Sequence, residues 1–318
     1  MNSIDEPYYV AFCCDDNYTQ YVRVTILSIL ENNPNKYINI YVLTDYLSKR
    51  NIKNLQALSS LNPQLNLFII KVDDTALKNL PTTKNWTLHT WYRLLIPQYI
   101  DKSISKILYL DADTLVGGSL KDLFNINLDN KSIAATPEAN FFNSEFYQRL
   151  GYDKHKGYIC AGVMLMNLDY WRDHNLAEKA IKWAKINKNQ LKLLDQDAIN
   201  YICQDSKIIL PLKYGVVQWY YVIEEFYKDS FHDQLIESVN SPLIIHYAFT
   251  PPWYKDCQKH IFHDLWISYN NKLKKPARVK YRSKGFLKLK LMVWNFIHPE
   301  NKPCISKDSI LDKLKLSY

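Results

Sequence analysis

Short apolar runs alternate with longer stretches of mixed polarity along the first part of the chain. The runs are rich in Val, Ile and Tyr and predict strands at residues 8–14, 38–43, 65–72 and 107–110. Between them, residues 17–33 repeat apolar positions every three to four residues, which predicts a helix, and residues 47–61 also suit one. Residues 86–99 are typical of a helix that ends at Pro97.

The second part of the chain continues this alternation less regularly. It predicts strands at residues 133–136, 159–166 and 243–246, and helices at 176–186 and 196–203. The irregular residues 140–156 are compatible with a loop on the acceptor side of a binding site. Strands that alternate with helices predict an α/β fold, in which helices cover both faces of a mostly parallel central sheet.

Composition narrows the class of protein. The chain has 318 residues, of which 47% are hydrophobic and 14% aromatic, so it can bury a full core and is not generally disordered. Only 7 residues are Gly, and none forms a Gly-rich phosphate loop or a G-x-G-x-x-G turn. Any bound phosphate is therefore expected to be held by a metal ion and by side chains.

The net charge of +8 is concentrated at the carboxyl end. Residues 272–318 carry 13 Lys and Arg against 3 Asp and Glu, which leaves residues 1–271 at −2. We therefore divide the chain into an α/β domain, 1–271, and a basic tail, 272–318. In a helical tail, Phe286, Leu289 and Val293 would share one face with Lys284 and Lys288 opposite, a pattern suited to an anionic membrane surface. A flexible or packed extension is the alternative, and the near-neutral body argues against a nucleic-acid partner.

The chain shows none of the usual signs of export. Its six Cys form no C-x-x-C pair, its first residues lack a basic segment followed by an apolar one, and no run reaches the ~18 apolar residues of a membrane span. We expect a cytoplasmic protein with free thiols, held at the inner face of the membrane by the tail.

Two carboxylates follow directly after the apolar run in KILYLDADTLVGGSL, residues 106–120. Asp111 and Asp113 are spaced i and i+2, so they project from one face of an extended segment. Two such carboxylates repel one another unless a cation lies between them, which predicts a divalent-metal site at a strand end. Two alternatives remain, a capped strand end and a haloacid-dehalogenase-type phosphatase with Asp111 as nucleophile and Asp113 as acid-base.

Several motifs occur in an order that resembles glycosyltransferase family 8, nearest to bacterial lipooligosaccharide α-galactosyltransferases. The resemblance covers about residues 8–269 and implies a nucleotide-sugar transferase domain of the GT-A type. The motifs are CCDDNY at 13–18, TWYRL at 90–94, DAD at 111–113, CAGVMLMNL at 160–168, DQD at 195–197 and HYAFTPPW at 246–253.

The resemblance implies a nucleotide site and a metal site. Asp15 would accept a hydrogen bond from uracil, Asn17 would position the nucleotide, Tyr18 would stack on the base and Arg93 would contact the donor. The alternative for the first of these is a helix cap at Asp16 and Asn17. The metal ligands implied are Asp111 and Asp113, around Ala112, together with His246, and the imidazole favours Mn²⁺ over Mg²⁺.

The resemblance also implies groups around the transferred sugar. Asp195 would contact its hydroxyls, unless it serves only as a charge at a helix amino terminus. Gln196 would face the anomeric carbon, and Glu138 would lie on the acceptor side. The family retains anomeric configuration, and because Gln is a poor nucleophile we expect front-face attack with Gln196 as a positioning or electrostatic group.

Two departures from the family pattern affect the donor site. Cys160 replaces the usual Asn, and HYAFTPPW is one residue shorter than the family motif and lacks its Gly and Lys; Lys255 lies nearby. The prediction is transfer of galactose or glucose from a UDP-sugar to a lipid-linked lipooligosaccharide or lipopolysaccharide core. A non-catalytic nucleotide-sugar-binding protein is the alternative that these departures keep open.

Overall fold

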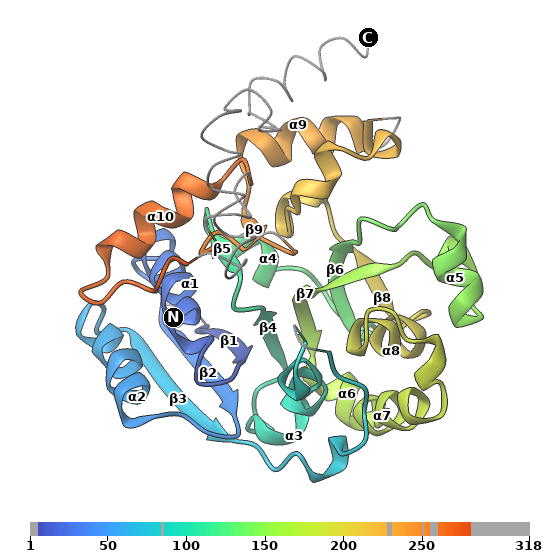
Figure 1. The fold of residues 1–318 in the computed structure, drawn as a ribbon, viewed down its shortest axis with the longest axis horizontal. Coiled ribbons are helices and arrows are strands. Elements are labelled where there is room, and N and C mark those ends of the chain that lie inside the picture. Colours follow the sequence, from blue (N-terminus) through green and yellow to red (C-terminus); the bar gives the residue numbers. More distant parts are fainter. Residues whose placement is uncertain (1–5, 84–85, 228–230, 250, 255–259, 281–318) are drawn as a thin grey trace, which may run out of the picture.

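A seven-stranded sheet crosses the molecule, with the strand order β3-β2-β1-β4-β7-β6-β8 (Figure 1). The structure is a computed structural model, and it describes residues 6–83, 86–227, 231–249, 251–254 and 260–280. Six strands run in the same direction, and β7 alone is antiparallel to both of its neighbours. The predicted mostly parallel α/β sheet is thus confirmed. A smaller two-stranded sheet pairs β5 with β9.

The strands are β1 Tyr8–Cys13, β2 Ile38–Thr44, β3 Leu65–Lys71, β4 Lys106–Leu110, β5 Thr114–Val116, β6 Ile133–Pro137, β7 Ile159–Asn167, β8 Lys207–Ile209 and β9 Ile244–His246. The helices are α1 Thr19–Asn32, α2 Lys49–Gln56, α3 Ile96–Tyr99, α4 Lys121–Phe124, α5 Ser144–Leu150, α6 Leu168–Asp173, α7 Leu176–Ile186, α8 Asp195–Ile202, α9 His232–Asn240 and α10 His263–Lys272. A 3₁₀ helix, η3, spans Leu88–Leu95.

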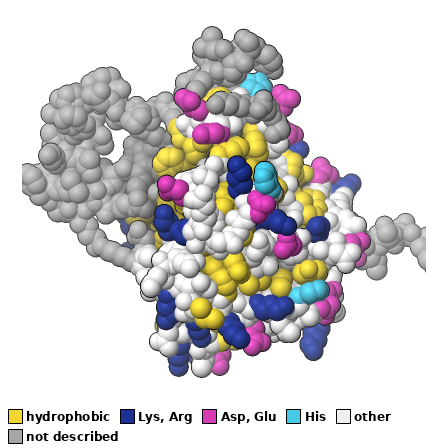
Figure 2. Space-filling view, turned by 90° about the vertical axis from the view of Figure 1, so that its right-hand side faces the viewer, with side chains coloured by type: hydrophobic (Ala, Val, Ile, Leu, Met, Phe, Trp, Pro, Cys, Tyr) yellow, Lys and Arg dark blue, Asp and Glu magenta, His cyan; other side chains and the backbone are white. Residues whose placement is uncertain are grey.

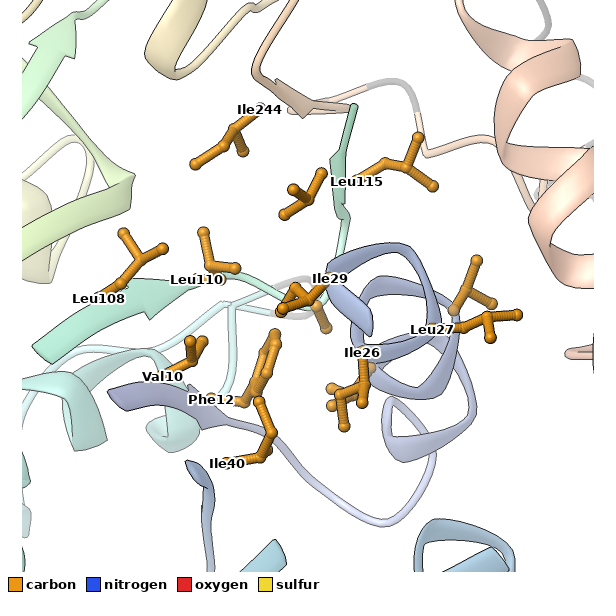
Figure 3. Close-up of a cluster of buried hydrophobic side chains, with 14 of the residues drawn as sticks. Val10, Phe12, Ile26, Leu27, Ile29, Ile40, Leu108, Leu110, Leu115 and Ile244 are labelled. Atoms are coloured by element: carbon orange, nitrogen blue, oxygen red, sulfur yellow. The ribbon is translucent and has the colours of Figure 1, made fainter. Parts of the chain in front are cut away.

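Helix α1 packs the first half of the sheet against the small sheet. Its apolar side chains, including Ile26 and Ile29, meet Val10 and Phe12 of β1 and Leu115 of β5 in one buried cluster (Figure 3). Burial of such side chains stabilises the fold by roughly 1.5–3 kcal/mol each. The same packing holds β5 and β9 beside the end of β4.

The structure corrects the helix expected at residues 86–99. It is a 3₁₀ helix, η3, followed by the short α3, and Pro97 lies in the first turn of α3 instead of ending a helix. A proline is tolerated there because the first turn of a helix needs no donated N–H. Residues 140–156 are less irregular than expected, since they contain α5, capped by Asn143 and by Gly151 at φ +71°.

The carboxyl end of the described chain returns to the body. After α10, Leu273 and Ala277 are buried, and the Lys280 N–H donates to Trp253 O at 2.8 Å. The boundary at 271/272 stays a prediction, and the amphipathic tail from residue 281 onward lies outside the described residues. Among the described helices, none has the length and apolar content of a membrane span.

Lys207 gives a test of the core that does not involve the site. It is 9% exposed, and its Nζ lies 5.1 Å from the Tyr152 ring centroid and 3.5 Å from Asn200 Oδ1, with no carboxylate as ion-pair partner among the described residues. Burial lowers the pKa of the Lys207 ammonium to about 8. We expect Lys207→Met to raise the free energy of unfolding at pH 7 by roughly 2 kcal/mol.

The expected gain depends on pH in a defined direction. Because the folded pKa lies below the unfolded value of about 10.4, the penalty of burying the charge is complete below pH 8 and fades as the pH rises towards 10.4. Urea unfolding of the variant and the unmodified protein at pH 7 and at pH 10 measures this. A gain that does not shrink at pH 10 contradicts the assignment.

Candidate active site

A cleft opens at the carboxyl ends of β1 and β4, facing β9 and the start of α8. Most of the side chains expected from the sequence line it: Asp15, Tyr18, Arg93, Asp111, Ala112, Asp113, Glu138, Asp195, Gln196 and His246. They come from segments far apart in the chain, and the sheet order brings them together. Asn17 is the exception, because it is exposed and does not line the cleft. Its role therefore stays a prediction.

Hydrogen bonds at the end of β4 place Asp111, Asp113 and His246 together. The Asp111 N–H donates to Gly162 O of β7 at 2.8 Å, so the turn begins where the sheet pairing ends. The pairing of β5 with β9 sets Thr114 opposite His246. The Tyr247 N–H also donates to Asp113 O at 2.8 Å. The DAD turn and the distant strand end are thus fixed by backbone contacts.

The three side chains offer ligand atoms suited to a divalent cation. His246 Nε2 lies 3.4 Å from Asp113 Oδ1 and 3.7 Å from Asp111 Oδ2, and one ligand atom of each residue lies within 4.8 Å of the others. Two carboxylate oxygens and an imidazole form a mixed O/N set that suits Mn²⁺ and other first-row cations. Burial opposes ionisation of Asp113, but the His246 imidazole outweighs it and holds the pKa of Asp113 below its ordinary value. The residues therefore fit the predicted metal site.

The second oxygen of Asp111 is held from the opposite side. Asp111 Oδ1 accepts a hydrogen bond from Tyr109 OH at 2.5 Å and lies 3.0 Å from Arg93 Nη2. Arg93 also donates through Nη1 to Ala161 O at 2.6 Å. Burial disfavours its charge, but Asp111 and Asp195 more than compensate and raise the pKa of Arg93. These contacts leave Asp111 Oδ2 directed at His246.

Asp195 is the other partner of Arg93. It is 4% exposed, and its Oδ2 lies 2.9 Å from Arg93 Nε. Burial raises the pKa of Asp195 to about 7, although the guanidinium acts in the opposite direction. Asp195 is thus part of a buried charged cluster in the cleft wall, which is more than a charge at a helix amino terminus.

Both ends of the Gln196 amide are occupied. Its Oε1 accepts the Ala161 N–H at 2.9 Å, and its Nε2 donates to Glu138 Oε2 at 3.0 Å. Burial raises the pKa of Glu138, although the bond from Gln196 opposes this. The amide is therefore fixed in one orientation beside a buried carboxyl group.

The departure at Cys160 lies against the predicted metal ligand. Cys160 Sγ is 3.4 Å from His246 Nδ1, the ring nitrogen that points away from the two aspartates. Gly162, two residues further along β7, leaves room for the ring, since a Cβ there would lie only 2.2 Å from His246 Cε1. The ring thus packs against this part of β7.

The nucleotide-binding roles of Asp15 and Tyr18 stay predictions, and the alternative of a helix cap at Asp16 and Asn17 is wrong, because no side chain caps α1. Asp15 Oδ1 accepts the Tyr18 N–H at 2.8 Å in the turn that leads into α1. Asp16 instead accepts the Ser48 N–H at 2.7 Å and holds the start of α2. Tyr18 packs edge-on against Trp253 of the HYAFTPPW motif at 5.9 Å. Lys255 lies outside the described residues.

Asp197, the last residue of DQD, has a structural role. It is fully buried and holds Arg149 of α5 through two bonds of 2.8 Å. It also accepts Tyr158 OH at 2.5 Å and the backbone N–H groups of Lys192 and Leu193. The carboxylate therefore positions the start of α8, which carries Asp195 and Gln196.

We expect Asp197→Ala to lower the free energy of unfolding by about 3 kcal/mol, because it leaves a guanidinium, a hydroxyl and two N–H groups without their acceptor. Chemical denaturation measures this. Asp205→Ala is the matched control, since Asp205 pairs with Lys156 at the surface and its loss should cost less than about 1 kcal/mol. Equal losses in the two variants would contradict the assigned role.

Several cleft residues were missed by the sequence analysis. Tyr109 lies two residues before Asp111, so it shares that face of the strand, a signal that the sequence did contain. His89 lines the cleft with its Nε2 at 2.8 Å from Asp45 Oδ1 and its Nδ1 at 3.1 Å from Thr87 Oγ1. No pattern in the sequence pointed to His89 or to its partners Asp45 and Thr87.

Comparison with known proteins identifies the family of the chain. The family model described as "Glycosyl transferase family 8" matches residues 9–257. A lipopolysaccharide 1,2-glucosyltransferase of Escherichia coli is 30% identical over 254 residues, covering 78% of this chain and 74% of the relative. A lipopolysaccharide 1,3-galactosyltransferase of Salmonella typhimurium is 28% identical over 265 residues, covering 80% and 75%.

Solved structures support the same architecture. The galactosyltransferase LgtC, solved in complex with donor and acceptor sugar analogues, superposes with a TM-score of 0.75 at 22% identity and covers 89% of this chain and 99% of its own. This likeness confirms the GT-A type of fold. The family match also replaces the phosphatase interpretation of Asp111 and Asp113. The chain belongs to glycosyltransferase family 8.

Proposed function

We propose that the protein transfers galactose or glucose from a UDP-sugar to a hydroxyl group of a lipooligosaccharide or lipopolysaccharide core, with retention of configuration and with Mn²⁺ as the preferred cation. The observation that carries this proposal is the convergence of Asp111, Asp113 and His246 in the cleft of a family 8 fold. The relatives named for lipopolysaccharide glucosyl and galactosyl transfer support the choice of sugars and acceptor.

The metal site explains how a chain without a Gly-rich phosphate loop would handle a diphosphate. Asp111, Asp113 and His246 would hold the cation, which when bound neutralises the charge that develops on the UDP leaving group. Arg93 pairs with Asp111 and Asp195 and donates hydrogen bonds to Ala161 O and Thr90 O. It therefore keeps Asp111 oriented and is itself confined to the cleft wall.

Retention is proposed to occur by attack of the acceptor on the face that UDP leaves. The Gln196 amide has its carbonyl engaged by the Ala161 N–H and its NH₂ engaged by Glu138. An amide held in this way can stabilise a developing positive charge through its fixed dipole. It is poorly suited to act as a nucleophile that forms a covalent bond. Burial raises the pKa of Glu138. Its carboxyl group would accept a hydrogen bond from the acceptor hydroxyl group and so orient it.

The enzyme is also proposed to work in the cytoplasm at the inner face of the membrane. The support is the sequence of the tail, which mixes 13 Lys and Arg with apolar residues between 272 and 318. A lipid-linked acceptor would lie at that surface.

Transfer to a core oligosaccharide acceptor tests the proposal. The purified protein is incubated with Mn²⁺, a truncated lipopolysaccharide and either UDP-glucose or UDP-galactose, and the product linkage is assigned by NMR. We expect one donor to give an α-linked product. A β-linked product would contradict retention. Binding of UDP without transfer or hydrolysis for any donor and acceptor would favour a non-catalytic nucleotide-sugar-binding protein.

A further inference from the structure

A positive surface without ion pairs lies where the carboxyl end of the described chain packs on α1, which also contacts α2. We name it the basic surface and define it by Arg23, Lys49, Arg50, Lys53, Lys274, Lys275, Arg278 and Lys280. None of these side chains forms an ion pair with a carboxylate anywhere in the described part of the chain. Elsewhere several cations are paired, as Lys272 is with Glu31.

Arg23 joins the two halves of this surface. It is 6% exposed, and its Nη1 donates to Lys275 O at 3.0 Å. Its Nε is buried without a hydrogen-bond partner among the described residues. Burial, aided by the nearby charge of Arg50, lowers the pKa of Arg23. A buried guanidinium with no acid and a second guanidinium beside it is costly unless an anion is present.

The other cations lie on exposed positions of α2 and of the segment that follows α10. Lys49, Arg50 and Lys53 lie on the exposed side of α2, opposite Leu55, which is buried. On the crossing segment, Leu273 and Ala277 face the core while the Lys and Arg residues between and after them are exposed. The Arg278 N–H donates to Gln20 Oε1 at 3.0 Å, which fixes this segment on α1.

The face on the other side of the molecule carries mixed charges. Figure 2 shows the side that lies to the right in Figure 1, where Lys and Arg are interspersed with Asp and Glu. Asp16, which contacts α2, is occupied by the Ser48 N–H and the Asn51 side chain and does not pair with these cations. The positive charge of the basic surface is therefore uncompensated by its neighbours.

We propose that the basic surface docks on the anionic headgroups of a phospholipid bilayer. Beyond Lys280 the chain continues for 38 residues with 8 Lys and Arg against 3 Asp and Glu, mixed with apolar residues, so the surface is continuous with a segment of the same chemistry. Each cation near an anionic leaflet adds to binding. The proposal extends, and rests on, the proposed work at a membrane, since it adds a folded surface to the tail.

Docking by this surface would place the donor end of the cleft near the bilayer. Lys280 is bonded to Trp253 O, and the Trp253 ring packs against Tyr18, which lines the cleft.

Vesicle flotation with the full chain tests the proposal. Vesicles of phosphatidylcholine with and without phosphatidylglycerol are compared at low and high salt, using K49Q/R50Q/K53Q and K274Q/K275Q/R278Q. We expect each triple variant to bind phosphatidylglycerol vesicles at least about tenfold more weakly than the unmodified chain. The matched control K179Q/K182Q/K188Q changes three exposed Lys on and beside α7 and should bind normally.

Three outcomes would overturn the proposal: unchanged binding in both triple variants, an equal loss in the control, or tighter binding of the surface to an RNA oligonucleotide than to the vesicles. UDP binding and UDP-sugar turnover are measured on the same variants in detergent and should be unchanged. If turnover is absent in every protein while vesicle binding still depends on the surface, the transferase proposal fails and the basic surface stands. If turnover is present but vesicle binding does not depend on the basic surface, the docking proposal fails and the transferase proposal stands.

Discussion

Asp111→Asn and Asp113→Asn should each lower metal-dependent turnover by roughly a thousandfold, because each removes one of the two charged oxygen ligands that face His246. The size of the side chain is kept. Arg93 also keeps Asp195 as a charged partner, so the fold should be preserved, with a melting temperature within about 3 °C of the unmodified protein. Release of UDP from the donor, measured across a series of Mn²⁺ concentrations, checks this.

Asp122→Asn is the control for these variants. Asp122 lies exposed on α4, away from the cleft, and its replacement should change neither turnover nor its dependence on Mn²⁺. Undiminished turnover in Asp111→Asn or in Asp113→Asn would remove the metal assignment. A loss of folding in both would leave the test to His246→Asn, at the third ligand position.

Gly162→Ala should disable the same site without touching a ligand. The added Cβ would lie 2.2 Å from His246 Cε1 and 2.7 Å from its Nε2, so the ring must move. We expect the free energy of unfolding to fall by roughly 1–3 kcal/mol and the affinity for Mn²⁺ to fall by about a hundredfold. Calorimetry of unfolding and titration with Mn²⁺ measure the two effects separately.

A second substitution distinguishes a steric effect from general damage. In the double variant Gly162→Ala with His246→Ala the ring is gone, so stability should recover by most of the amount lost, while Mn²⁺ binding should not. Gly118→Ala is the control, because its Cβ would meet only the tip of the Leu243 side chain at 3.1 Å. A double variant as unstable as Gly162→Ala would show that the collision with His246 is not the cause.

Apolar runs made most of the strands predictable. The strands expected at 8–14, 38–43, 65–72 and 159–166 agree with β1, β2, β3 and β7 to within a few residues, because each is a nearly continuous apolar run. Those expected at 107–110, 133–136 and 243–246 agree in the same way with β4, β6 and the three-residue β9. Strands β5 and β8, also of three residues, were not predicted, because so short a segment carries no readable period. The antiparallel direction of β7 is set by its pairing partners and could not be deduced from its composition.

The site was predictable where spacing or family resemblance marked it. Asp111 and Asp113 were predicted from their i, i+2 spacing after an apolar run, although the structure places them in the turn between β4 and β5 and not in an extended segment. His246 required the resemblance, because 132 residues separate it from Thr114, its neighbour across β5 and β9. The contact of Cys160 with His246 depends on how β7 lies beside β9 and has no local signature.

The central claim is that this family 8 chain uses its Asp111, Asp113 and His246 cluster to support transfer from a UDP-sugar. The most direct measurement is UDP release by the purified protein from UDP-galactose and from UDP-glucose, each with Mn²⁺ and with EDTA. We expect release from one of the donors with Mn²⁺ and none with EDTA. Release that continues undiminished in EDTA, or failure of UDP to bind with Mn²⁺ present, would contradict the account.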